Sequence, residues 1–321
     1  MKEIAKLVGY RESIKVVDAT LRDGGLVNDF FFNDDFVRQL YQTNIDANVD
    51  YMEFGYRASK KIFDESKFGK WKFSTDEHIR EIVGENDTNL KLAVMADIGR
   101  HELKDFDQKA NSPVDLIRVA TYIHQMPEAI EMIEDAAKKG YETSCNIMAI
   151  SGAQREDVEV ALDMLGKTPV DCVYIVDSFG SLYPEQIARI ADLYLNFAAK
   201  FNKKVGIHAH NNQQLAFANT IEACSDGVDW LDGTYMGMGR GAGNCAMELL
   251  LGFLKNPKYN IYPVFQFIQN QMIKLKDDGI VWGYDLQYLM TGQLNQHPRT
   301  AIQFTKENRR DYAEFYKEIS L

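Results

Sequence analysis

Three consecutive segments decide the fold: KVGIHAH at 204–210, QQLAFANTIEACSD at 213–226 and WLDGTYM at 230–236. The first and third are short and largely apolar or β-branched, which is typical of strands buried on both faces. The middle segment has apolar residues at helical spacing and ends just before Gly227, a residue that suits a helix C-terminus. Together they predict one strand–helix–strand unit of a parallel sheet.

The same alternation extends back through the chain. Six further runs have the length and composition of strands, at 14–21 (IKVVDATL), 49–56 (VDYMEFGY), 90–97 (LKLAVMAD), 114–121 (VDLIRVAT), 143–150 (TSCNIMAI) and 171–177 (DCVYIVD). Helical patterns lie between them, most clearly at 33–47, 127–139 and 184–200, where Asn33, Pro127 and Pro184 suit helix starts. A helix is also expected within 57–88, but the sequence pattern does not define its bounds.

Eight strand–helix repeats predict an α/β fold, a closed (β/α)8 TIM barrel over 14–256. The alternative is an open doubly wound sheet, which usually carries a glycine-rich phosphate loop after its first strand. The first strand here runs into LRDGG instead. Residues 257–321 contain helical patterns such as VFQFIQNQMIKL and no obvious linker, so we expect a C-terminal helical extension packed on the barrel.

Composition narrows the function classes. The 321 residues carry 47 acidic against 36 basic side chains, a net charge of −11, which argues against a nucleic-acid binder. No apolar run reaches the length of a membrane-spanning helix, and the N-terminus lacks a signal-peptide core. The four cysteines form no CxxC pair and suit a reducing compartment, so we expect a cytoplasmic protein.

Polar side chains cluster where the predicted strands end, and barrel active sites form at the carboxyl ends of strands. These side chains are Asp18, Thr20, Arg22, Asp23, Glu53, Tyr56, Arg118, Thr121, Asn146, Asp177, Ser178, His208, His210 and Asn212. The sequence therefore predicts a polar site at the end of the barrel where the strands have their carboxyl ends, which we call the barrel mouth.

His208 and His210 are the sharpest pair. Residues two apart on a strand point to the same face, so two imidazoles can chelate one divalent cation. Asp23 can complete the set, because the first strand neighbours the last in a closed barrel. The alternative is that one imidazole simply forms a hydrogen bond in the core.

Arg22 precedes Asp23 and could stabilise a developing enolate by its charge. The alternative for Arg22 is a salt bridge with Glu53 or Asp18. Arg118, Ser178 and Thr121 are candidate substrate contacts, although short hydroxyls in barrels often bond to the backbone. The glycines of GMGRGAG at 237–243 permit a tight loop or bind an anion through backbone amides, and the sequence leaves both open.

Five motifs resemble the DRE-TIM metallolyases, most closely the 4-hydroxy-2-oxovalerate aldolases. They are DATLRDGG at 18–25, IRVAT at 117–121, VDSFG at 176–180, HAHNN at 208–212 and GMGRGAGN at 237–244. The resemblance implies a TIM barrel holding one divalent metal ion, commonly Mn²⁺ or Mg²⁺. It places the ligands on Asp23, His208 and His210, the enolate-stabilising arginine on Arg22, and a carboxylate-binding serine on Ser178.

This sequence departs from that pattern at one position. The pyruvate aldolases have a proton-transferring histidine three residues after the metal-binding aspartate, and Leu26 stands there. Leucine cannot move a proton. We rank His297 first as the replacement, ahead of Asn28, Asp29 and Tyr284.

The leading hypothesis is therefore metal-dependent cleavage or formation of a carbon–carbon bond next to a 2-oxo acid, with an aldehyde as co-substrate. Arg22 and His297 are the predicted catalytic residues. The predicted substrate contacts are Arg22, Glu53, Arg118, Thr121, Asn146, Ser178 and Asn212. A Claisen-type acyl-CoA lyase or synthase and a non-catalytic metabolite-binding barrel are the alternatives. The resemblance also leaves open a homodimer and an acylating aldehyde dehydrogenase partner contacting the C-terminal extension.

Overall fold

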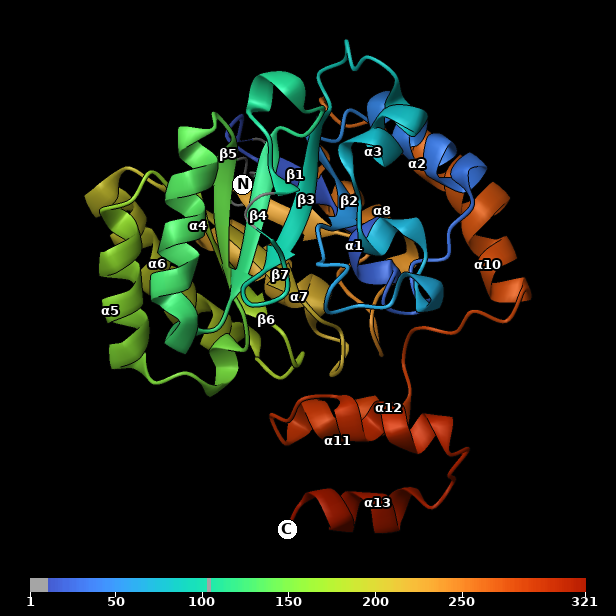
Figure 1. The fold of residues 1–321 in the computed structure, drawn as a ribbon. Helices are drawn as coiled ribbons and strands as arrows, with labels where there is room; N and C mark the ends of the chain where they lie inside the picture. Colours follow the sequence, from blue (N-terminus) through green and yellow to red (C-terminus); the bar gives the residue numbers. More distant parts are fainter. Residues whose placement is uncertain (1–10, 103–104) are drawn as a thin grey trace, which may run out of the picture.

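The computed structural model describes residues 11–102 and 105–321. Within them, eight parallel strands close into a barrel in sequence order, which confirms the predicted (β/α)8 fold (Figure 1). The strands are β1 Lys15–Asp18, β2 Tyr51–Tyr56, β3 Lys91–Asp97, β4 Leu116–Thr121, β5 Glu142–Ile147, β6 Cys172–Asp177, β7 Lys204–Ala209 and β8 Trp230–Gly233. β1 closes the barrel by pairing with both β2 and β8, so that Val17 lies opposite Tyr51 on one side and Asp232 on the other.

The helices cover the outside of the barrel and its mouth. They are α1 Thr20–Gly24, α2 Asp34–Asp46, α3 Asp76–Val83, α4 Met126–Lys138, α5 Arg155–Gly166, α6 Pro184–Phe201, α7 Ala216–Asp226, α8 Met247–Leu254, α9 Tyr262–Phe267, α10 Ile273–Asp277, α11 Leu286–Gln293, α12 Arg299–Lys306 and α13 Tyr312–Ile319. Local sequence sets several of their starts. The Asn33 side chain accepts a hydrogen bond from the Phe36 amide at 2.8 Å, and α4 and α6 carry a proline in the first turn.

The inside of the barrel is layered because alternate residues of each strand point inward. The lower layer is apolar and includes Tyr51, Leu116, Tyr174 and Trp230, with the Tyr51 and Trp230 rings 4.8 Å apart. One inward position further along the strands, charged side chains replace the apolar ones. The barrel therefore has a packed floor beneath a polar mouth.

The first strand is shorter than expected. It ends at Asp18, and residues 20–24 wind into the short helix α1, which carries Arg22 and Asp23. The Asp18 carboxylate accepts hydrogen bonds from the amide and hydroxyl of Thr20, which turns the chain out of the strand. β8 likewise ends at Gly233, and a 3-10 turn at Tyr235–Gly237 follows it.

One expected repeat lacks its helix among the described residues. Between β3 and β4 they form only a 3-10 turn at Lys109–Asn111. Within 57–88, where the sequence did not define the bounds of the helix, the structure has α3. Two 3-10 turns precede it, at Glu65–Lys67 and Lys70–Lys72.

The residues after α8 divide into two parts. α9, a π-helical turn at Ile268–Met272 and α10 follow the outside of the barrel beside α2, where Gln271 donates a hydrogen bond to Gln39. α11, α12 and α13 lie apart from this group, in red at the bottom of Figure 1. α11 contacts the loops at the barrel mouth, since Asn212 donates a hydrogen bond to the Tyr288 carbonyl at 3.3 Å.

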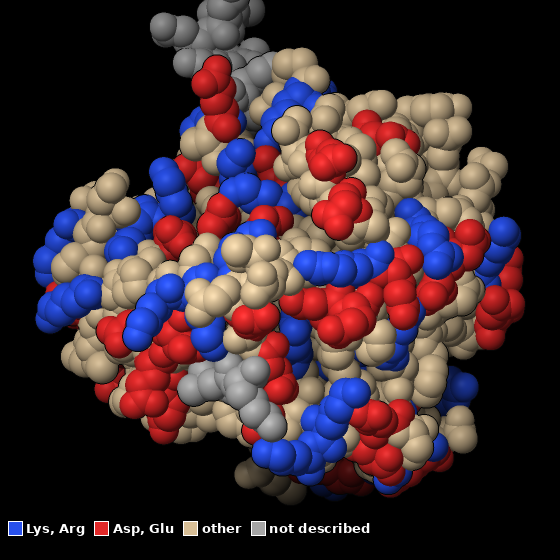
Figure 2. Space-filling view, turned by 45° about the horizontal axis from the view of Figure 1, so that its top comes forward, with Lys and Arg blue, Asp and Glu red and all other residues tan. Residues whose placement is uncertain are grey.

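The surface drawn in Figure 2 mixes basic and acidic side chains over the whole face. Among residues 11–102 and 105–321, no helix has the length and apolar character needed to span a bilayer.

The glycine loop at 237–243 is explained by turn geometry. Gly237, Gly241 and Gly243 have φ of +61°, +63° and +84°, which side chains rarely adopt. The amides of Gly237 and Gly243 donate to the carbonyls of Thr234 and Arg240 within the turn itself. A Cβ at position 243 would lie 2.0 Å from the Gly237 carbonyl oxygen.

We therefore expect Gly243→Ala to lower the free energy of unfolding by about 2 kcal/mol or more, measured by urea titration. Gly252→Ala is the matched control, because Gly252 lies inside α8 and the new methyl would meet only the Ile261 side chain at 3.8 Å. That control should be neutral or stabilise by up to about 1 kcal/mol. Equal effects of the two substitutions would contradict this account of the loop.

Candidate active site

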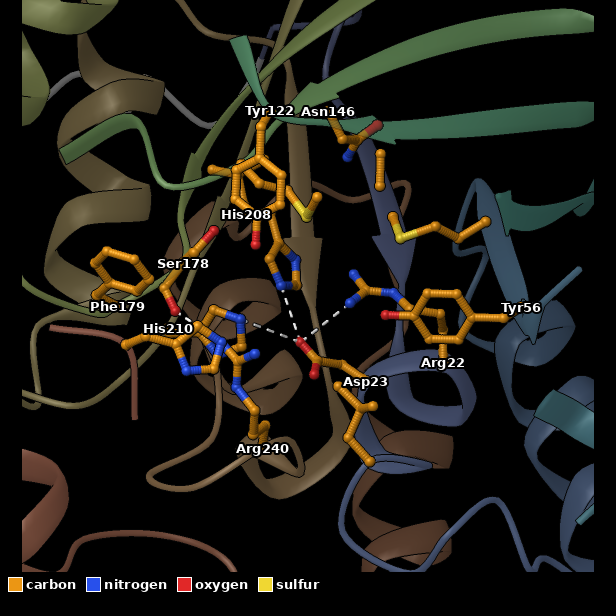
Figure 3. Close-up of a pocket in the computed structure, with 16 residues that line it drawn as sticks. Arg22, Asp23, Tyr56, Tyr122, Asn146, Ser178, Phe179, His208, His210 and Arg240 are labelled. Atoms are coloured by element: carbon orange, nitrogen blue, oxygen red, sulfur yellow. Dashed lines mark hydrogen bonds and ion pairs between the residues drawn. The ribbon is translucent and has the colours of Figure 1, made fainter. Parts of the chain in front are cut away.

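Three buried side chains converge at the barrel mouth (Figure 3). Asp23 comes from α1, His208 from β7, and His210 from just beyond that strand. The Asp23 Oδ2 atom lies 3.0 Å from His208 Nε2 and 3.6 Å from His210 Nε2. The three residues can each offer one ligand atom within 4.8 Å of the others, so they form a candidate metal triad.

A second set of charges supports Arg22 from behind. The Arg22 Nε atom donates to Glu53 Oε2 at 2.8 Å, and its Nη1 atom lies 3.2 Å from Asp23 Oδ2. Arg118 Nη1 donates to the same Glu53 oxygen at 2.9 Å. Glu53 and Arg118 are fully buried. Arg22 is thus held on two sides, which leaves Nη2 without a protein partner among the described residues.

The same network continues to the triad. Arg118 Nη2 donates to Asp232 Oδ2 at 2.6 Å, and that oxygen lies 2.9 Å from His208 Nδ1. Both ring nitrogens of His208 thus face a carboxylate, and although burial opposes its ionisation, the hydrogen bonds with Asp23 and Asp232 raise the pKa of His208. With a metal ion at Nε2, the proton would stay on Nδ1 and donate to Asp232. We call the closed circuit of these six side chains the charge ring; its members in order are Arg22, Glu53, Arg118, Asp232, His208 and Asp23.

The donor set fits a divalent cation. Three carboxylates and two guanidinium groups give the charge ring one net negative charge with His208 neutral. Asp23 Oδ1 and His210 Nδ1 are buried atoms without a hydrogen-bond partner. Two imidazoles and one carboxylate on one face of a site are a common set for divalent metals, and they leave positions open for a substrate.

The charges around the triad decide the ionisation of its members. Burial opposes ionisation of Asp23, but His210, Arg22 and His208 together hold its pKa well below the usual value. Burial lowers the pKa of His210 well below its usual value, so the His210 imidazole is neutral. A carboxylate and a neutral imidazole are the forms that bind a metal ion.

The triad opens into a cavity of about 70 Å³. Of the sequence-predicted site residues, the cavity wall includes Arg22, Asp23, Asn146, Ser178, His208, His210 and His297. The Ser178 hydroxyl accepts a hydrogen bond from the Ala149 amide at 2.8 Å, which leaves its proton free to bind a substrate oxygen.

Four predicted substrate contacts do not line this cavity. Glu53 and Arg118 lie behind Arg22 in the charge ring. Thr121 donates to the Tyr122 carbonyl at 3.0 Å, and Asn212 donates to the Tyr288 carbonyl. Their side chains support the cavity wall and are not part of its surface. Tyr284 is 58% exposed and lies outside the cavity wall.

His297 reaches the cavity from the turn before α12. Its ring packs edge-on against Phe179, with the ring centroids 5.8 Å apart. The Arg299 amide donates to His297 Nδ1 at 3.1 Å, so in the neutral ring the proton sits on Nε2. Burial, with the nearby charges of Arg240 and Arg299, lowers the pKa of His297 to about 4.

Sequence reasoning missed three polar or aromatic residues of the cavity wall, Tyr122, Phe179 and Arg240. Each directly adjoins or lies within a motif that was noticed: Tyr122 follows IRVAT, Phe179 lies in VDSFG, and Arg240 lies in GMGRGAGN. The position after a strand end was the available signal for Tyr122. For Arg240, the available signal was that it is the one charged residue in the glycine-rich loop at 237–243.

The fold and the buried triad together define a barrel with a candidate metal site at its mouth. Residues 13–271 match the HMGL-like family model, and the chain belongs to this family. It is 30% identical over 259 residues to an oxaloacetate decarboxylase of Mycobacterium tuberculosis, covering 77% of this chain and 71% of that protein. It is 28% identical over 253 residues to a 4-hydroxy-2-oxovalerate aldolase of Bacillus cereus, with the same coverage.

Solved structures agree with the fold. The N-terminal domain of a proposed aldolase from Bacteroides vulgatus superposes with a TM-score of 0.74 at 27% identity, covering 91% of this chain and 96% of that one. The HMG-CoA lyase of Bacillus subtilis superposes with a TM-score of 0.65 at 16% identity, over 83% of this chain and 95% of that one. The family and its named members identify the protein as an enzyme of the metal-dependent lyase class.

We expect His208→Ala to weaken Mn²⁺ binding by at least about 100-fold, because it removes one of three ligands. Electron paramagnetic resonance of free Mn²⁺ during titration of the protein measures this. His297→Ala is the matched control, since it removes a histidine from the same cavity but outside the triad. Equal binding by the two variants would place the ion elsewhere.

Proposed function

We propose that this enzyme cleaves or forms a carbon–carbon bond next to a 2-oxo acid through a pyruvate-type enolate, in the manner of an aldolase. One observation carries the proposal: Arg22, buried and held by Glu53 and Asp23, presents its remaining Nη2 group beside the triad. A fixed guanidinium at that place stabilises negative charge that develops on a substrate oxygen during the reaction.

The residues divide the work as follows. Asp23, His208 and His210 would hold a divalent ion, which supplies a Lewis acid for the substrate carboxylate and 2-oxo group. Arg22 donates hydrogen bonds to the oxygen that becomes the enolate oxygen. Ser178 donates its hydroxyl proton to the substrate carboxylate. Glu53 and Arg118 act through Arg22 and are positioning residues.

The supply of a proton acceptor distinguishes two reactions. Aldol cleavage requires a base to take the proton of the hydroxyl group, and Leu26 lines the cavity at the family's histidine position. His297 is the candidate for proton transfer, but Nδ1 accepts from the Arg299 amide, so Nε2–H faces a substrate as a donor. With its pKa lowered to about 4 by burial and the nearby arginines, the neutral imidazole can donate a hydrogen bond there, but it neither takes up the hydroxyl proton at Nε2 nor releases its own proton to carbon.

This observation favours a second candidate, decarboxylation of a 2-oxo acid with a carboxylate at C3. Loss of CO2 from that acid delivers the electron pair to the enolate without a base. One relative is named oxaloacetate decarboxylase, which agrees with this candidate. Both reactions share the enolate and the roles of Arg22 and the triad.

Further details stay predictions. Mn²⁺ or Mg²⁺ is the expected ion, because carboxylate and imidazole ligands with open positions suit both. An aldehyde as co-substrate and an aldehyde dehydrogenase partner rest on the family resemblance. A cytoplasmic location rests on the scattered cysteines, and a homodimer would form through the exposed barrel helices.

The first test is exchange of the pyruvate methyl protons in deuterium oxide, followed by proton NMR. We expect exchange with Mn²⁺, its loss on chelation, and a loss of about 100-fold or more in Arg22→Gln. Arg100→Gln is the matched control, since Arg100 is an exposed arginine that pairs with Asp97. A metal-loaded enzyme that leaves the methyl signal intact would contradict the proposal.

The proton acceptor is tested by restoring the family residue. We expect Leu26→His to raise the rate of cleavage of 4-hydroxy-2-oxovalerate relative to oxaloacetate decarboxylation by about 100-fold. Acetaldehyde and pyruvate release are measured with coupled dehydrogenases, and Leu26→Gln controls for polarity. An unchanged ratio would mean that another group already serves as the base.

A further inference from the structure

Arg240 is a cation of the cavity wall that no acid neutralises. Its Nη2 atom donates to the Ser178 carbonyl at 2.8 Å, and its Nε atom is buried with no hydrogen-bond partner. Across residues 11–102 and 105–321, no carboxylate lies within ion-pairing distance of it. A guanidinium has five N–H donors, so most of its capacity is unused.

The charge count of the cavity shows why this matters. Arg22 is balanced by Asp23 and Glu53, and a divalent ion at the triad would be balanced by the charge ring and a 2-oxo acid. Arg240 would still carry one uncompensated positive charge in a half-buried position. Such a charge is unfavourable unless a ligand or water compensates it.

Arg240 lies on the Ser178 side of the cavity wall, where its free donors are open to a second anionic group of a substrate. Figure 3 shows Arg22 and Arg240 on opposite sides of Asp23, with Arg240 extending toward Ser178 and His210. Its loop is rigid, because the positive-φ glycines and the hydrogen bond from the Asn211 amide to the Gly243 carbonyl fix the turn. Ser178 and Arg240 therefore form one continuous polar wall beside the triad.

We propose that Arg240 binds a second carboxylate, so that the substrate is a 2-oxo acid whose carbon chain ends in another carboxylate. The inference rests on the proposed function, which places the 2-oxo acid at the triad. A single planar guanidinium with free donors matches a carboxylate in two hydrogen bonds. The aliphatic and aromatic wall formed by Met95, Met148, Val176 and Phe179 suits the methylene chain between the two ends.

A purely structural role is the competing account. In that account Arg240 only anchors the loop after β6 through the Ser178 carbonyl, and its substitution weakens every ligand to the same degree. The two accounts differ in the ratio of affinities for acids with and without a terminal carboxylate.

The test is calorimetric binding of matched acids to the Mn²⁺-loaded enzyme: 2-oxoglutarate against 2-oxopentanoate, and 2-oxoadipate against 2-oxohexanoate. We expect the wild type to prefer the dicarboxylate of at least one pair by about 10- to 100-fold. Arg240→Gln should bring that ratio close to one, and Arg240→Lys should restore part of it. Arg299→Gln, which removes an exposed charge near His297 without touching the cavity wall, should keep the wild-type ratio.

The outcomes separate the two proposals. Equal affinity of the wild type for both members of both pairs would overturn the inference about Arg240 alone. A parallel loss of affinity for both acids in Arg240→Gln would also overturn it, in favour of the structural role. Failure of all four acids to bind a metal-loaded enzyme that still exchanges the pyruvate methyl protons would overturn this inference alone, whereas loss of that exchange would overturn the proposed function.

Discussion

The charge ring is the constraint on which the rest of the site depends. Its six side chains are almost completely removed from water, and a buried charge is tolerated only when it is paired and hydrogen-bonded. Each member is paired with both neighbours, so a shift of one is resisted by the others. The charge ring therefore fixes the directions of the Arg22 and His208 side chains before any substrate arrives, which is the preorganisation that electrostatic catalysis needs.

The barrel makes this arrangement possible by its layers. Tyr174 and Trp230 in the apolar floor exclude water from below, and the Arg118 guanidinium lies 4.5 Å from the Tyr174 ring centroid. Above the charge ring, the C-terminal helices bring His297 to the barrel mouth, although His297 is far from the triad in the sequence. The wall of the cavity between them carries both the triad and Arg240, which would orient a substrate that has two anionic groups.

Leu26 separates this protein from the pyruvate aldolases it resembles. Leu26 makes its part of the cavity wall apolar, while His297, from the turn before α12, offers an N–H hydrogen-bond donor. Under the proposed function, Arg22 and the triad would stabilise an enolate, and Leu26 stands in place of the group that would remove a hydroxyl proton.

The sequence by itself determined the barrel and the triad. Buried parallel strands demand apolar runs of set length, and HxH on a strand places two imidazoles on one face whatever surrounds them. Asp18 and Thr20 ended the first strand through a side-chain turn that the pattern of apolar residues does not reveal. Only the tertiary structure decided that Glu53 and Arg118 lie behind Arg22, that Asp232 orients His208, and that Arg240 has no acidic partner. These are pairings between residues on different strands and loops, and their geometry depends on strand stagger and side-chain packing, which no local pattern in the chain encodes.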